Sequence, residues 1–342
     1  MQTTNTDRPR LISGWLILLA VLIALMVTVG GATRLTDSGL SITEWDLVTG
    51  TLPPLGEEAW EAELEKYRQI PEYEQVNFGM SLAEFKQIYY WEWGHRLLGR
   101  VIGMFVLVPL LWWSIRGTVK GGLRWRLWGL FFLVGLQGAI GWFMVASGLS
   151  ERIDVSQYRL ALHLGTAFIL FGLVVWQALA LIRPPGRAAN GEGLGRLAGL
   201  FGVALFAQII LGAFVAGLRA GKTYNTWPLM DGEFIPSGYF PGAVGISHLF
   251  ESIAAVQFNH RIGAYVMFAL AAYVMLRTWR AGRARPYGVL IFLGIFAQML
   301  MGIWTVVTAV PLWLGLAHQL GALLLLALTI VATYDLTGRR QA

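Results

Sequence analysis

Eight runs of apolar residues, each close to the length of a bilayer crossing, constrain this 342-residue chain more than any other feature. A helix needs about 20 apolar residues to cross the hydrocarbon core of a membrane. A composition of 56% hydrophobic and 13% charged residues excludes a soluble multidomain protein. The sequence therefore predicts an all-α integral membrane protein with eight transmembrane helices, which begin at about Leu11, Tyr89, Leu127, Tyr158, Leu197, Phe258, Tyr287 and Leu312.

The distribution of charge predicts how the chain crosses the membrane. The net charge of +6 does not indicate a nucleic-acid partner, because arginine and lysine collect in alternate connections. The opposite connections, residues 30–88 and 218–257, are longer and carry much of the acid. By the positive-inside rule both termini face the cytoplasm and the large loops face the periplasm. The first run has the length of a full span, so we expect no signal or transit peptide, and a bacterial inner membrane fits best.

The chain contains an internal repeat. Residues 31–54 align without gaps to residues 213–236, and the pair His95-Arg96 then matches His260-Arg261. The surroundings of His163 resemble those of His318. Four spans form one unit, and an even number of spans leaves both copies with the same orientation. We therefore expect two tandem pseudo-symmetric four-helix bundles, residues 1–190 and residues 191–342.

Four of the five histidines occupy matching positions in this repeat: His95, His163, His260 and His318. An imidazole inside a membrane span is costly unless it binds or transfers something. Two facing imidazoles can hold a haem iron from both sides, and a four-helix bundle is a common place for such a cofactor. The sequence predicts one haem-sized metal site in each half. The alternative is four buried histidines that bond a serine, a glutamine or a backbone carbonyl.

His248 is the fifth histidine and lies outside the repeat pattern. We expect it to be a solvated loop residue. Cysteine is absent, which excludes thiolate ligation of a haem and iron–sulfur clusters.

The two halves differ at one position close to these histidines. Glu92 lies three residues before His95, on nearly the same helix face, whereas Gln257 lies three residues before His260. A carboxyl group in a partly dry site can accept a proton or stabilise positive charge on a substrate carbon. We expect the first half to react its ligand and the second half to hold a permanent haem. The alternative is a solvated acid at the helix entrance.

Other residues have two interpretations each. Arg96 and Arg261 follow their histidines, and they either bind haem propionates or extend to water at the membrane boundary. Residues 57–73 have an amphipathic pattern typical of a short helix over the first bundle, which is either a lid or an ordinary interfacial helix. Glutamine and glycine recur four residues apart, and we interpret these as helix-packing seams: Gln137 with Gly141, Gln208 with Gly212, and Gln298 with Gly302.

Three strings of residues resemble a known family. GGATRLTDSGLS at residues 30–41, EWGHR at residues 92–96 and QFNHR at residues 257–261 are similar to the haem A synthases, eight-helix enzymes of cytochrome oxidase assembly. The resemblance covers nearly the whole chain. It implies an oxidoreductase that converts the C8 methyl group of haem O to the formyl group of haem A by successive hydroxylations.

The resemblance also implies roles for single residues and for partners. His260 and His318 would be the axial ligands of a retained haem b, His95 and His163 would serve the substrate haem, and Glu92 would be the catalytic carboxylate. Partners would be haem O as substrate, the farnesyltransferase that makes haem O, an electron donor and the lipid bilayer, with a homo-oligomer left open. Many bacterial members carry cysteine pairs in the periplasmic loops, so a disulfide-based redox role does not carry over to this Cys-free chain.

Two other classes of protein fit part of the pattern. A membrane cytochrome b that relays electrons would also need two bis-histidine haems, but it would not explain Glu92 opposite Gln257. A proton-coupled transporter would explain the repeats and the intramembrane His and Glu residues. It would bind no haem.

Overall fold

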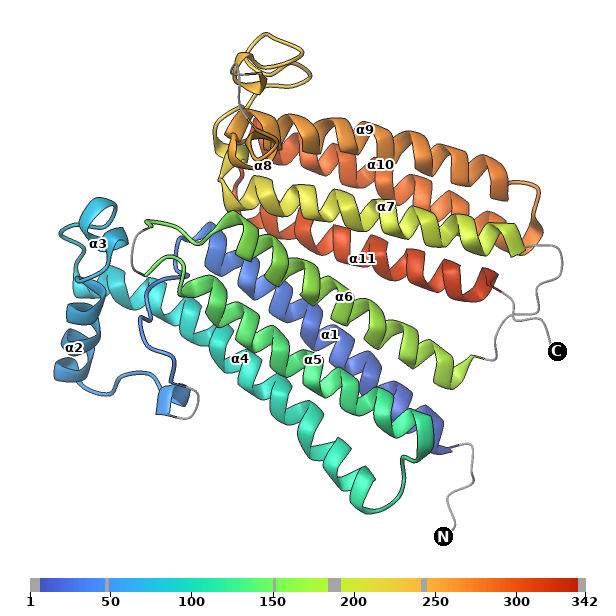
Figure 1. The fold of residues 1–342 in the computed structure, drawn as a ribbon, viewed down its shortest axis with the longest axis horizontal. Coiled ribbons are helices and arrows are strands. Elements are labelled where there is room, and N and C mark those ends of the chain that lie inside the picture. The colour runs from blue at the N-terminus through green and yellow to red at the C-terminus, as the bar shows by residue number, and fades with distance from the viewer. Residues whose placement is uncertain (1–6, 47–48, 150–151, 184–191, 241–244, 338–342) are drawn as a thin grey trace. The chain divides into compact units, whose positions relative to one another are not determined.

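A computed structural model of the chain describes residues 7–46, 49–149, 152–183, 192–240 and 245–337 (Figure 1). Within these ranges the regular structure is helical, and the only β-type pairing is an isolated bridge between Met230 and Glu233. Eight of the helices are long and apolar enough to cross a membrane, so the chain is a multi-pass membrane protein, as predicted. They are α1 (Asp7–Leu35), α4 (Leu82–Ile115), α5 (Gly121–Val145), α6 (Gln157–Ile182), α7 (Glu192–Gly217), α9 (Ile253–Thr278), α10 (Arg285–Val307) and α11 (Leu312–Leu336).

Polar capping extends α4 beyond its apolar run. The Ser81 hydroxyl accepts a hydrogen bond from the backbone N–H of Glu84, and the Glu84 carboxylate accepts one from the backbone N–H of Ser81 at 2.8 Å. This is a reciprocal capping box of the Ser-x-x-Glu type, and it satisfies two backbone donors that the first turn leaves free. The helix therefore begins seven residues before Tyr89 and brings Glu92 and His95 to its third and fourth turns.

The chain forms two compact units, one from residues 1–20 with residues 171–342 and the other from residues 21–170. In the first unit α7 packs against α9 and α11, and α10 packs against the same two helices (Figure 1). In the second unit α4 packs against α5. The predicted boundary between residues 190 and 191 lies outside the described residues, and the division of the chain at that point stays a prediction.

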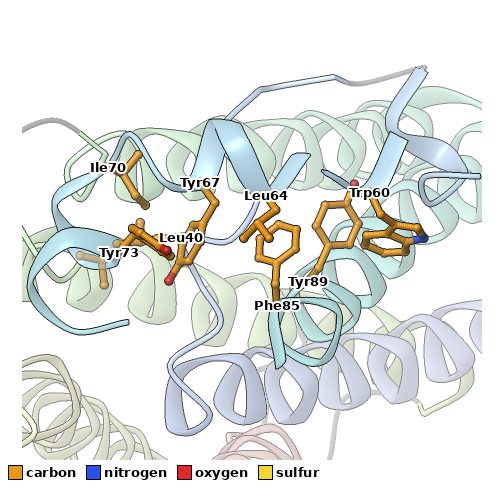
Figure 2. Close-up of a cluster of buried hydrophobic side chains, with 9 residues drawn as sticks. Leu40, Trp60, Leu64, Tyr67, Ile70, Tyr73, Phe85 and Tyr89 are labelled. Atoms are coloured by element: carbon orange, nitrogen blue, oxygen red, sulfur yellow. The ribbon is translucent and has the colours of Figure 1, made fainter. Parts of the chain in front are cut away.

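The loop after α1 carries two short helices, α2 (Glu57–Tyr67) and α3 (Pro71–Gln75). Trp60, Leu64 and Tyr67 follow helical spacing and form a buried face of α2 that packs against Phe85 and Tyr89 of α4 (Figure 2). Both interpretations of this segment, lid and interfacial helix, require such a face. The expected single helix over residues 57–73 is wrong in one respect, because it stops before Pro71. A proline disfavours helical backbone in the residue before it, and Ile70 is extended with φ −100° and ψ 153°.

The carboxyl group of Glu72, on α3, is buried. The Glu72 side chain accepts a hydrogen bond from the Tyr67 hydroxyl at 3.2 Å, and that hydroxyl accepts one from Asn77 at 2.7 Å. Burial raises the pKa of Glu72 to about 7. The negative charges of Asp154, Glu92 and Asp37 raise it further, while the bond from Tyr67 opposes the shift.

We expect the α2–α3 segment to be held more tightly at about pH 5 than at about pH 8. The pKa of this carboxyl group rises from 4.5 to about 7 on folding. Its protonation therefore stabilises the folded state fully below pH 4.5, and this stabilisation is lost as the pH rises through 7. The free energy that stabilises the folded segment differs between low and high pH by at most roughly 3 kcal/mol. Hydrogen exchange of residues 57–75 at the two pH values, corrected for the intrinsic rates, measures it. Glu72→Gln should remove the pH dependence and the exposed control Glu74→Gln should keep it; equal protection of the wild type at both pH values would contradict the prediction.

Candidate functional site

Two of the candidate metal ligands face each other in the unit formed by α7 and α9 to α11. The ring centroids of His260 on α9 and His318 on α11 lie 6.4 Å apart, and the ring planes are nearly perpendicular at 82°. Across the described ranges, no group of three or more His, Cys, Asp or Glu side chains is placed to hold a metal ion. The protein therefore offers a pair of imidazoles here rather than a complete metal-binding cage.

A glycine on a neighbouring helix lies against each of the four imidazoles. A Cβ atom added at any of these glycines would lie between 2.9 and 3.3 Å from an imidazole atom, closer than ordinary contact. A larger residue would therefore push the ring out of place, so the absence of a side chain lets each ring sit against the neighbouring backbone. The pairs are Gly30 with His95, Gly141 with His163, Gly212 with His260, and Gly302 with His318.

Three of the imidazoles are also contacted by a glutamine one turn before the glycine. The amide nitrogen of Gln208 donates to the backbone oxygen of His260 at 2.8 Å and lies 3.1 Å from Nδ1 of the same residue. The corresponding distances are 2.7 and 3.1 Å from Gln137 to His163. They are 2.6 and 3.2 Å from Gln298 to His318.

The predicted packing seams are therefore confirmed in part. A small residue does allow close approach and an amide does bond across the gap, as expected. Sequence reasoning missed that the partner in each case is a candidate metal ligand. The signal was available in the repeat, because glutamine, glycine and histidine recur together on adjacent spans.

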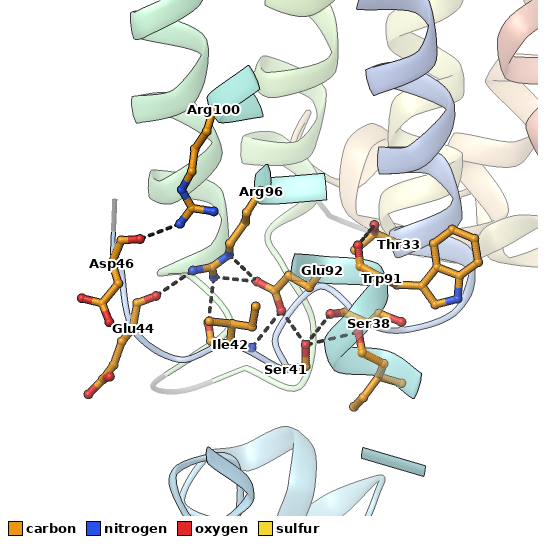
Figure 3. A network of polar contacts seen from close by, with 11 residues as sticks. Thr33, Ser38, Ser41, Ile42, Glu44, Asp46, Trp91, Glu92, Arg96 and Arg100 are labelled. Atoms are coloured by element: carbon orange, nitrogen blue, oxygen red, sulfur yellow. Dashed lines mark hydrogen bonds and ion pairs between the residues drawn. The ribbon is translucent and has the colours of Figure 1, made fainter. Parts of the chain in front are cut away.

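Glu92 lies at the centre of a buried polar network (Figure 3). Its Oε1 accepts hydrogen bonds from Arg96 at 2.6 and 3.0 Å, and its Oε2 accepts from the Ser41 hydroxyl at 2.8 Å and from the Ile42 backbone N–H at 2.9 Å. The residue is 2% exposed, so the alternative of a solvated acid at the helix entrance is wrong. All four contacts come from donors, so N–H and O–H groups enclose both carboxylate oxygens.

The two arginines hold the loops that follow α1 and α7. Arg96 donates to the backbone oxygens of Ile42 at 2.7 Å and Glu44 at 2.6 Å (Figure 3). Arg261 donates to the backbone oxygen of Tyr224 at 2.9 Å, and Gln257 donates to the same oxygen at 3.0 Å. Ile42 and Tyr224 occupy equivalent positions in the gapless alignment. Neither interpretation of the arginines, propionate binding or extension to water, includes this contact with the loop backbone. The contact connects each candidate site to the loop after α1 or after α7.

Ser41→Ala should destabilise the protein by about 2 kcal/mol, because it removes a hydrogen bond to a buried charged group. Thermal unfolding in detergent, followed by circular dichroism, measures the change. Thr223→Ala is the matched control: Thr223 occupies the equivalent position in the second copy, its side chain is exposed, and its replacement should cost less than about 0.5 kcal/mol. Equal effects of the two substitutions would show that the Glu92 network does not depend on Ser41.

His248 differs from its prediction. It begins the short helix α8 (His248–Glu251), is half-buried, and its Nε2 donates to the backbone oxygen of Gly238 at 3.1 Å. It is therefore half-buried rather than solvated, in a short helix within the loop between α7 and α9. Its partner is a backbone carbonyl of its own loop.

Comparison with known proteins identifies the family of the chain. A family model described as "Cytochrome oxidase assembly protein" matches residues 13–330. A protein of Maricaulis maris named "Heme A synthase" is 48% identical over 339 residues, which cover 98% of each chain. One of the same name from Bradyrhizobium diazoefficiens is 49% identical over 97% of this chain and 93% of its own length. A protein of the same name from Parvibaculum lavamentivorans is 49% identical over 93% of this chain and 92% of its own length. The chain belongs to the cytochrome oxidase assembly protein family that includes these haem A synthases.

Proposed function

We propose that this protein is a haem A synthase, an oxidoreductase that converts the C8 methyl group of haem O to the formyl group of haem A by successive hydroxylations. The observation that carries the proposal is 48–49% identity over almost the full length to relatives named "Heme A synthase". Glu92, His95 and His260 occur in the strings that resemble the family. The product would serve as a cofactor of cytochrome oxidase.

The pair His260 and His318 fits a retained haem b. Two imidazoles that bind one metal from opposite sides at about 2 Å have ring centroids roughly 6–6.5 Å apart. The observed 6.4 Å agrees with this spacing. Because the described part of the chain supplies two ligands here, the remaining positions around the iron would fit a porphyrin. When bound, haem b supplies a one-electron redox centre.

His95 and His163 serve the substrate haem O in this proposal, and Glu92 acts beside them. Of the two roles considered for Glu92, stabilising positive charge is the one that its contacts favour. Its oxygens accept four hydrogen bonds, from Arg96, Ser41 and Ile42, and these donors hold the carboxylate in one position. A fixed negative charge in a water-poor site is effective because it needs no rearrangement during the reaction.

The proposal includes the arrangement of the chain in the membrane. The two halves, residues 1–190 and 191–342, form tandem four-helix bundles in the inner membrane of a bacterium, with both termini in the cytoplasm and the large loops in the periplasm. The matching contacts of Arg96 with Ile42 and of Arg261 with Tyr224 support the repeat. The farnesyltransferase that makes haem O and an electron donor are the expected partners, and a homo-oligomer is compatible with this arrangement.

Extraction of the pigments from purified protein, with identification by mass, tests the proposal. We expect haem b together with haem O or haem A, and production of haem A when the membranes are supplied with haem O and a reductant. Haem b alone, with no conversion, would instead indicate an electron-relaying cytochrome b. A colourless protein that binds no added haem would indicate a transporter.

A further inference from the structure

One arginine contacts both the carboxylate of Glu92 and the loop that follows α1. Nε and Nη2 of Arg96 donate to Oε1 of Glu92 at 3.0 and 2.6 Å (Figure 3). Nη1 and Nη2 also donate to the backbone oxygens of Glu44 and Ile42, at 2.6 and 2.7 Å. These bonds use four of the five N–H donors of the guanidinium group. To bind a haem propionate by two parallel bonds, Arg96 would therefore have to give up at least one of them.

An aromatic side chain covers this arginine and connects it to α5. The ring centroid of Trp45 lies 5.6 Å from Cζ of Arg96, within the range of a cation–π contact. Trp45 also contacts Trp142 on α5, with ring centroids 6.2 Å apart and ring planes at 60°. Trp142 directly follows Gly141, the glycine that lies against His163. These contacts link the arginine on α4 to the helix that packs against a candidate iron ligand.

The arginine of the second half holds the loop but not the neighbouring side chain. Gln257 and Arg261 are the equivalents of Glu92 and Arg96, and both donate to the backbone oxygen of Tyr224. The side-chain oxygen of Gln257 is buried and has no hydrogen-bond partner among the described residues. The first half therefore differs in that its arginine fixes the side chain at this position as well as the loop.

We propose that Arg96 and Trp45 are positioning residues for the carboxylate of Glu92. The inference rests on the proposed function, in which this carboxylate stabilises positive charge beside the substrate haem. Such stabilisation depends on distance, and an error of about 1 Å in the placement of a reacting group can lower a rate by about 100-fold. Two bonds from one planar guanidinium group, itself tied to backbone oxygens and covered by an indole ring, hold the carboxylate in one orientation.

Conservative substitutions test the inference by kinetics on the full-length protein. Arg96→Lys replaces the planar fork with a single ammonium group. We expect kcat for haem A formation to fall by about 10- to 100-fold while KM for haem O stays within about twofold of the wild type. Trp45→Leu should lower kcat by about 2- to 5-fold, and Trp45→Phe, which keeps an aromatic face, should restore most of it. A raised KM with unchanged kcat in Arg96→Lys would indicate a propionate ligand and would overturn the positioning role.

A double variant separates action through Glu92 from an independent contact with the substrate. A positioning residue has no effect once the group that it positions is gone. Arg96→Lys should therefore lower the residual rate of Glu92→Gln by no more than about twofold. Full multiplication of the two separate losses in the double variant would overturn the inference.

Hydrogen exchange gives a readout that needs neither haem nor turnover. The backbone N–H of Ile42 donates to Oε2 of Glu92 at 2.9 Å, so its protection reports whether the carboxylate stays in place. In Arg96→Lys this amide should exchange at least about tenfold faster than in the wild type.

Arg100→Lys is the matched control for both measurements. Arg100 lies one turn later on α4 and donates to the backbone oxygen of Asp46 at 2.5 Å (Figure 3). It holds the same loop without a hydrogen bond to Glu92 in the described part of the chain. Its replacement should leave kcat and the exchange of the Ile42 amide within about twofold of the wild type. Equal effects of the two lysine substitutions would show that only the hold on the loop matters, which would overturn the inference.

The outcomes distinguish this inference from the proposed function. If the wild type forms haem A but Arg96→Lys keeps its kcat and the protection of the Ile42 amide, the positioning role is overturned while the proposed function stands. A wild type that forms no haem A from haem O contradicts the proposed function itself. Should Arg96→Lys fail to accumulate, the comparison of Trp45→Leu with Trp45→Phe replaces it. A lower kcat in Trp45→Leu alone supports the inference, and equal kcat values in both variants and the wild type overturn it.

Discussion

Glu92→Gln should lower the rate of haem A formation by about 100- to 1000-fold while haem b stays bound. The substitution keeps the shape of the side chain but removes the negative charge, and it gives the first half the residue type that the second half has at Gln257. The new amide also places two protons among groups that are all donors, Arg96, Ser41 and the Ile42 N–H. The ratio of haem A to haem O in extracted pigments, measured by mass, gives the effect.

The control for this prediction is a second carboxylate of the same region. The Glu44 side chain is 54% exposed and pairs with Lys66, while only its backbone oxygen contacts Arg96. Glu44→Gln should therefore leave haem A formation within about twofold of the wild type, as expected for an exposed ion pair. Normal haem A output from Glu92→Gln would remove Glu92 from the mechanism. Loss of haem b from the same variant would show that the substitution acts through the fold.

His260→Ala should lower bound haem b by at least about 100-fold and thereby stop conversion, because in the proposed function His260 and His318 would hold the haem b that supplies the redox centre. The loss of one of two facing imidazoles leaves His318 alone on the iron. The measurement is the stoichiometry of haem b per protein from a pyridine haemochrome spectrum.

Two further histidine variants complete this experiment. His248→Ala should retain the full amount of haem b, because His248 bonds a backbone carbonyl of its own loop. His95→Ala should also retain haem b but lose substrate haem. Unchanged haem b in His260→Ala would show that the division of labour between the halves is wrong.

The sequence predicted the helices well because their lengths are set by the membrane rather than by packing. Eight apolar runs, a capping box at Ser81 and a buried face on α2 were all readable from local patterns. The errors have local causes too. The helix expected over residues 57–73 breaks before Pro71, and His248 begins a short helix that a loop assignment missed. Both depend on backbone geometry over a few residues, which hydrophobic periodicity does not report.

The candidate site was predictable only as a set of residue types. The repeat selected the histidines, and the difference between Glu92 and Gln257 marked one half as distinct. The sequence did not reveal that Gln208 contacts His260, because the two residues are far apart in the chain and on separate helices. Nor did it reveal that Arg96 bonds the loop after α1, since that contact requires the loop to fold back over α4.

By itself, the sequence determined the number of spans, the repeat and the residues able to bind a metal, because each of these follows from composition or spacing along one helix. Only the tertiary structure decided that His260 and His318 lie 6.4 Å apart, that Glu92 is enclosed by donors, and that a glutamine contacts three of the four imidazoles. The physical reason is that side-chain hydrogen bonds act over about 3 Å. Which groups come that close is fixed by the packing of helices that the sequence presents only one after another.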